Sequence, residues 1–174
     1  DYEADEPTFN LYGWNIGDAA AELWVSHTSV ENFPEGMAVS DKSDVSFTDD
    51  GWIVMFGIKE IPEPEEDDKD NGEEEKEAVF DLWHWNDPLP QPQQKQMAEE
   101  VRNNTWESVY HLKSKNFVQL ADEELPDVRL SDNGKIAFGQ TFWPYSKKIA
   151  HFGTFYDVYV VDPLTGDKTK VKEE

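Results

Sequence analysis

Two stretches of this sequence repeat one pattern, and that repeat constrains the fold more than any other feature. The stretches are VSFTDDGWIVMFG (45–57) and VRLSDNGKIAFG (128–139), in which a Ser/Thr-Asp-Asp/Asn-Gly step separates two apolar runs. Asp-Gly and Asn-Gly steps favour tight hairpin turns, because these residues tolerate positive φ. The turn glycines, Gly51 and Gly134, lie 83 positions apart. Each stretch therefore predicts a β-hairpin.

A second pair of similar stretches follows the first. ESVYHLKSKNFVQLAD (107–122) and YDVYVVDPLTGDKTKVKE (156–173) both read as an aromatic strand, a polar turn containing Lys or Gly, and a more polar strand. Gly166 is the expected left-handed position of the later turn. The combined order predicts a four-stranded antiparallel meander that is used twice.

Four-stranded antiparallel meanders form the blades of β-propellers. We therefore predict an all-β fold, a partial β-propeller with about two full blades and a partial blade before residue 44. Two similar hairpins in an ordinary β-sandwich are the alternative. Strand patterns rich in aromatic and β-branched residues support an all-β chain, and they lie at 21–27, 44–48, 52–58, 78–85, 107–112, 116–121, 135–140 and 156–162.

Two segments depart from the strand pattern within this single domain of residues 1–174. Residues 62–77, PEPEEDDKDNGEEEKE, are almost wholly charged and predict a flexible surface loop. Lys69 interrupts the ligand pattern of a calcium-binding loop there, so no metal site is predicted. Residues 91–103 predict a short helical insert.

The charge and the amino-acid composition exclude several classes of function. The net charge is -23, from 38 acidic and 15 basic residues, and such a field repels nucleic acid and anionic membrane surfaces. No apolar run is long enough to insert into a membrane as a helix. The absence of cysteine excludes disulfides, Cys-based zinc sites and a thiol nucleophile. No cofactor is predicted.

Three runs carry a more specific signal. They are EGMAVSDKSDVSFTDDGWIVMFGIKEIPEPEE, FDLWHWNDPLPQPQQ and FVQLADEELPDVRLSDNGKIAFG, in this order. Together they resemble the N-terminal β-propeller region of secreted serine peptidases of the prolyl oligopeptidase family, of the Bacteroidetes type. The resemblance extends from about residue 10 to the end of the chain, and the DLWHWNDPLPQPQQ run is its most specific part.

The resemblance implies a non-catalytic role. In that family the propeller caps a separate C-terminal α/β-hydrolase domain, which holds the catalytic Ser, Asp and His, and restricts entry to small or unfolded peptides. It also implies a secreted or periplasmic protein. Gly13 and Gly17 are the only glycines four positions apart, and Asn15 stands between them, so the Gly-x-Ser-x-Gly nucleophile motif is absent. We assign no catalytic residue and expect no enzymatic activity of this chain alone.

Candidate binding residues are aromatic. Trp83, His84 and Trp85 are consecutive, and Trp143 lies in a long link between strands. Stacking on these rings would suit a peptide- or carbohydrate-binding module. The alternative is packing, because Trp83 and Trp85 share one face of a strand. A third possibility is a self-pairing interaction scaffold, a homodimer formed through open blade edges.

Overall fold

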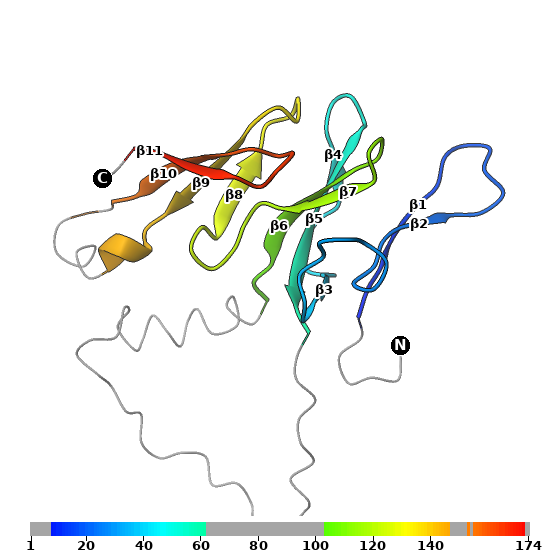
Figure 1. Cartoon of the computed structure of the whole chain (residues 1–174), viewed down its shortest axis with the longest axis horizontal. Helices are drawn as coiled ribbons and strands as arrows, with labels where there is room; N and C mark the ends of the chain where they lie inside the picture. Colours follow the sequence, from blue (N-terminus) through cyan, green and yellow to red (C-terminus); the bar gives the residue numbers. More distant parts are fainter. Residues whose placement is uncertain (1–7, 62–102, 147–152, 154, 173–174) are drawn as a thin grey trace, which may run out of the picture.

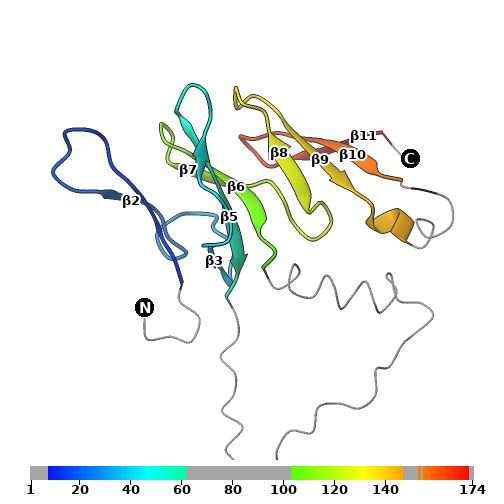
Figure 2. The ribbon, with the colours of Figure 1, turned by 180° about the vertical axis from the view of Figure 1, so that it is seen from behind.

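A computed structural model describes residues 8–61, 103–146, 153 and 155–172, and these residues form three antiparallel units that lie side by side as layers (Figures 1 and 2). The N-terminal hairpin contains β1 (Leu11–Gly13) and β2 (Glu22–Val25). The first sheet contains β3 (Met37–Val39), β4 (Ser46–Phe47), β5 (Ile53–Glu60), β6 (Trp106–His111) and β7 (Asn116–Gln119). The second sheet contains β8 (Asp127–Leu130), β9 (Ala137–Thr141), β10 (Asp157–Val161) and β11 (Lys168–Lys172).

Both sheets contain the predicted meander. The second sheet has the order β8-β9-β10-β11, and the first sheet runs from β4 through β5 and β6 to β7. The short strand β3 pairs with the far end of β5, on the same edge as β4. All pairings are antiparallel. The prediction of an all-β chain with two four-stranded antiparallel meanders is therefore confirmed for the described residues.

The two meanders share their register as well as their strand order. Met55 of β5 pairs with Val109 of β6, and Phe138 of β9 pairs with Val160 of β10. Met55 and Phe138 lie 83 positions apart, as the turn glycines do, and Val109 and Val160 lie 51 positions apart. Paired residues of β4 to β7 therefore have definite counterparts in β8 to β11.

The Asp-Gly and Asn-Gly turns are built alike. Gly51 and Gly134 have φ of 70° and 67°, which confirms the predicted positive φ. In each turn the N–H of the isoleucine that follows the glycine donates 3.3 Å to the hydroxyl that opens the turn, from Ile53 to Thr48 and from Ile136 to the serine of the second turn. These local bonds explain why the motif recurs as the same structure.

The two later turns are counterparts as well. Gly166, in the β10–β11 turn, has the predicted left-handed conformation with φ of 79°. Its counterpart 51 positions earlier, Lys115 of the β6–β7 turn, has φ of 54° although it is not glycine. In each turn the left-handed residue donates its N–H, at 2.8 Å, to a carbonyl four residues back.

The apolar core lies between the layers. One cluster joins the N-terminal hairpin to the first sheet and includes Leu11, Val25, Val54, Phe56, Tyr110 and Phe117. The other joins the first sheet to the second and includes Val109, Val118, Leu120, Leu125, Val128, Ala137 and Val161. Both faces of the first sheet are therefore buried, and each large side chain removed from water contributes about 1.5–3 kcal/mol.

Some predictions differ from the structure or lie outside it. Strands β1 and β3 were not predicted, because three-residue strands leave too short an alternating pattern. The link after β9 contains an unpredicted 3-10 helix, η1 (Trp143–Tyr145), with Pro144 near its start. The predicted strand at 78–85, the acidic loop at 62–77 and nearly all of the helical insert at 91–103 lie outside the described residues.

Candidate functional site

The tight turns and the longer links lie at opposite ends of the layers. The Asp-Gly and Asn-Gly turns lie at the upper end of Figure 1, whereas β5 ends, β6 begins and η1 lies at the lower end. β5–β6 and β9–β10 are counterpart strand pairs in the two sheets. The two strands of each pair are connected at the same end of their sheet, so both links start from this end. The lower end therefore carries the strand ends that border the two longest links of the sequence, and long links commonly carry binding surfaces.

Aromatic rings cluster on the β9–β10 link. Phe142 and Trp143 stack with ring centroids 4.8 Å apart and an interplanar angle of 29°. Tyr145 and Phe155 lie 5.9 Å apart in a tilted arrangement. Trp143 remains 40% exposed. The link thus presents a stacked pair of rings of which one is accessible, which is a suitable geometry for stacking on another ring or on a proline.

A buried carboxylate anchors this aromatic cluster to the sheet. The Tyr145 hydroxyl donates 2.7 Å to Asp157 Oδ1, and Lys170 Nζ lies 2.9 Å from Asp157 Oδ2. Asp157 is only 2% exposed and pairs across the strands with Thr141, another buried residue. Charge-assisted bonds of this kind hold a side chain in one position. The Asp157 network therefore fixes the link against β10 and β11.

Near the same end, the carboxyl group of Glu107 has a raised pKa. Glu107 lies on β6, where it pairs with Gly57 and is next but one to buried Val109 on the same face of the strand. Burial raises its pKa from 4.5 to about 7, because removal from water disfavours the charged form. Glu107 can therefore change its charge near neutral pH.

The structure describes only one of the four predicted binding residues, and its binding role stays a prediction. Trp143 lies on η1 and is partly exposed, as a binding role requires. Trp83, His84 and Trp85 lie outside the described residues. Tyr145, Asp157 and Glu107 were not predicted. The YDVY run that contains Asp157 indicated a strand, but no local signal marked its carboxylate as buried.

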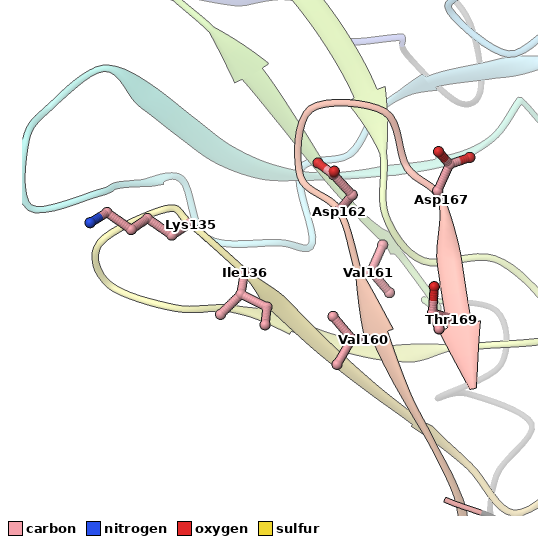
Figure 3. Close-up of a pocket in the computed structure, with 7 residues that line it drawn as sticks. All are labelled: Lys135, Ile136, Val160, Val161, Asp162, Asp167 and Thr169. Atoms are coloured by element: carbon pink, nitrogen blue, oxygen red, sulfur yellow. The ribbon is translucent and has the colours of Figure 1, made fainter. Parts of the chain in front are cut away.

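A hollow of about 410 Å³ lies at the turn end of the second sheet. Figure 3 shows Asp162 and Asp167 at the β10–β11 turn, with Ile136 and Val160 below them. Its lining residues are Lys135, Ile136, Val160, Val161, Asp162, Asp167 and Thr169. The hollow thus combines an apolar floor with two carboxylates.

The described residues do not assemble a recognisable catalytic or metal-binding set. His111 is buried, and its Nε2 lies 2.8 Å from the carbonyl oxygen of Pro163. This ring nitrogen therefore serves a structural hydrogen bond. No group of three or more His, Cys, Asp or Glu side chains among these residues is arranged to hold a metal ion. In the same part of the chain, no helix has the length and apolar character needed to cross a membrane.

Comparison with protein-family models, with curated proteins and with solved structures found no match to this chain.

Proposed function

We propose that this chain is a non-catalytic β-propeller segment of a secreted or periplasmic serine peptidase of the prolyl oligopeptidase type. In this proposal it gates the access of peptide substrates and docks against a separate C-terminal α/β-hydrolase domain. The observation that carries the propeller part is the repeated face-to-face packing of antiparallel units in equivalent register. The peptidase part rests on the resemblance of the sequence runs quoted above.

The packing between layers supports the propeller more than a two-layer sandwich. A sandwich buries one face of each sheet, whereas the first sheet here has apolar contacts on both faces. Its buried residues alternate toward the two neighbours, with Val54 and Phe56 facing the N-terminal hairpin and Ile53 facing the second sheet. Successive packed units of this kind are the arrangement from which a propeller is built.

The lower end of the layers offers the surface for gating. It carries the exposed Trp143, the Asp157 network that positions the link, and the ends of the strands that lead into residues 62–102. Under this proposal the aromatic link contacts the hydrolase domain or an entering peptide, and the catalytic groups belong to that domain.

The test is made on the full-length product of the gene. We expect it to hydrolyse short proline-containing peptides, to spare folded proteins and to be labelled by a fluorophosphonate probe at a serine outside residues 1–174. The 174-residue chain alone should show neither hydrolysis nor labelling. A full-length product that is not labelled, or labelling within the present residues, would reject the peptidase proposal.

The stacked Phe142–Trp143 pair also favours a second candidate, a module that binds peptides or oligosaccharides by ring stacking. It predicts saturable quenching of tryptophan fluorescence by proline-rich peptides or by oligosaccharides, reduced at least fivefold in Trp143→Ala. Trp52→Ala is the matched control, because Trp52 is similarly exposed but directly follows Gly51 of the Asp-Gly turn, before β5 begins. Equal quenching of the two variants would argue against this module.

A further inference from the structure

One face of the second sheet is buried against the first sheet, and the other is open. Phe138, Val160 and Thr169 form a cross-strand row on the open face, which we call the outer row. Phe138 is 52% exposed, Val160 is partly exposed and Thr169 is exposed. The outer row therefore has an apolar centre, Phe138 and Val160, between Thr169 and, on β8, the exposed Arg129, and it lacks a covering layer among the described residues.

The first sheet has the same row in the same register. Its members are Met55, Val109 and Val118, which pair across β5, β6 and β7. Val109 is completely buried, and all three belong to the cluster between the sheets or pack against it. The second sheet thus covers this row of the first sheet. The outer row, which holds the counterpart positions in the second sheet, is open.

At the turn end, too, residues that are covered in the first sheet have open counterparts in the second sheet. On the first sheet, His111 and Asn116 contact the β10–β11 turn, through Nε2 to the carbonyl oxygen of Pro163 at 2.8 Å and through Nδ2 to the carbonyl oxygen of Leu164 at 3.4 Å. Both side chains act as donors toward carbonyl oxygens. The first sheet therefore contacts the β10–β11 turn of the second sheet through hydrogen-bond donors.

The second sheet carries acceptors at the matching positions. The counterparts of His111 and Asn116, 51 positions later, are Asp162 and Asp167, which line the hollow of about 410 Å³ (Figure 3). Each carboxylate accepts one bond within its own turn, from Leu164 N–H or the Thr165 hydroxyl. A carboxylate has room for further donors. The occupant of this hollow must therefore bring donors or positive charge rather than carbonyl oxygens.

The apolar residues that line the hollow set a second requirement for its occupant. Ile136 lines the hollow, and its counterpart Ile53 packs against Gly134 of the next turn. A Cβ atom on Gly134 would lie 2.7 Å from Ile53 Cδ1. A turn that covers Ile136 in the same way needs glycine at the corresponding position.

We propose that the outer face of the second sheet is the docking surface for a further antiparallel sheet of the same kind. Its Asp-Gly-type turn would place glycine over Ile136, and its later turn would offer hydrogen-bond donors or basic side chains to Asp162 and Asp167. This inference rests on the propeller part of the proposed function and is independent of the peptidase part.

A second copy of this chain does not fit the same surface. The carbonyl oxygens of Pro163 and Leu164 in its β10–β11 turn already accept bonds from its own His111 and Asn116, so this turn is not free to dock on the two carboxylates. The net charge of -23 on each copy also opposes association. The further sheet is therefore expected to belong to the same polypeptide.

Cysteine labelling of the full-length gene product tests the proposal, since this chain has no cysteine of its own. Phe138→Cys and Val45→Cys are compared, because Phe138 and Val45 are 52% and 50% exposed. We expect N-ethylmaleimide to modify position 138 at least tenfold more slowly than position 45. Equal rates would overturn the proposal, and so would protection that disappears on dilution, because the latter identifies a second copy.

The charge requirement has its own test. Asp167→Lys is added to the Phe138→Cys variant. It should increase the labelling rate at position 138 at least threefold, because the lysine repels the donors of the docked sheet. Glu123→Lys, at an exposed position in the link between the two sheets, is the control and should leave the rate unchanged. An unchanged rate in the Asp167→Lys variant would reject the donor chemistry. Protection at position 138 without fluorophosphonate labelling would reject only the peptidase proposal.

Discussion

The backbone N–H of Asp49 donates a 2.8 Å hydrogen bond to the carbonyl oxygen of Asp132. These residues occupy the same position in the two Asp/Asn-Gly turns and lie 83 positions apart. The bond therefore joins the tips of equivalent turns on neighbouring sheets. It sets the two sheets in register at the turn end, while the apolar cluster between them supplies the area of contact.

Gly134→Ala should destabilise the protein more than Gly51→Ala. Both glycines have positive φ, which costs alanine about 1–2 kcal/mol. At Gly134 the new Cβ would also lie 2.7 Å from Ile53 Cδ1 and 3.0 Å from Thr48 Cγ2, whereas nothing lies within 4 Å at Gly51. We expect an additional loss of about 1–3 kcal/mol at Gly134, measured by urea unfolding. Equal losses would show that the turn does not press against the first sheet.

Asp157→Asn should reduce the free energy of unfolding by about 1–3 kcal/mol, because it leaves Lys170 without its 2.9 Å carboxylate partner. Asp127→Asn is the matched control, since Asp127 lies 3.5 Å from Arg129 in an exposed pair. Exposed pairs contribute about 0–1 kcal/mol. Chemical denaturation of both variants measures the difference. A loss at Asp157 no larger than that at Asp127 would contradict the anchoring role.

Glu107 should make the protein less stable as the pH rises. Its folded pKa of about 7 lies above the usual value of 4.5, so the folded state binds this proton more tightly than the unfolded state. Stability from this group is present at low pH and is lost between about pH 4.5 and 7. Glu107→Gln removes the effect and should be more stable than the unmodified protein at pH 8 by about 1–3 kcal/mol.

The comparison of unfolding curves at pH 5 and pH 8 isolates this contribution, because the remaining carboxylates are common to both proteins. Glu123→Gln is the control, since Glu123 is exposed in the link between the two sheets. A pH dependence of stability that is identical in the Glu107→Gln variant and the unmodified protein would exclude a raised pKa at Glu107.

His111→Gln should weaken the contact between the first sheet and the β10–β11 turn. His111 is buried and bonds to the carbonyl oxygen of Pro163 at 2.8 Å. Loss of this bond leaves a buried carbonyl oxygen without its partner, which costs about 1–3 kcal/mol. His27→Gln, at an exposed site, should change stability by less than about 0.5 kcal/mol. Thermal unfolding that places both variants at the same midpoint would refute this role.

Much of the secondary structure could be read from the sequence because its determinants are local. The four residues of each Asp/Asn-Gly turn contain the hydroxyl, the carboxylate or amide, and the glycine that close the turn. The alternation of apolar residues on either side predicted β5 and β9 and their partners. Strands β1 and β3 escaped prediction because three residues carry too little of that pattern.

The candidate site was predicted only in part. Trp143 was named from its aromatic surroundings; it is 40% exposed, and its binding role stays a prediction. The Asp157 network was not predicted, because Tyr145 and Lys170 reach Asp157 from a link and from a neighbouring strand. The predictions for Trp83, His84 and Trp85 concern residues outside the described part and stay predictions.

The sequence by itself determined the hairpins, the turn glycines and the doubled order of strands, since these depend on bonds between residues a few positions apart. Tertiary structure alone decided that both faces of the first sheet are covered, that Asp49 bonds to Asp132, and that the outer row of the second sheet is open. Those properties depend on contacts between residues of different packed units, such as Asp49 and Asp132, which lie 83 positions apart. A local pattern shows which residues are apolar, but the packing of the layers determines which residues bury them.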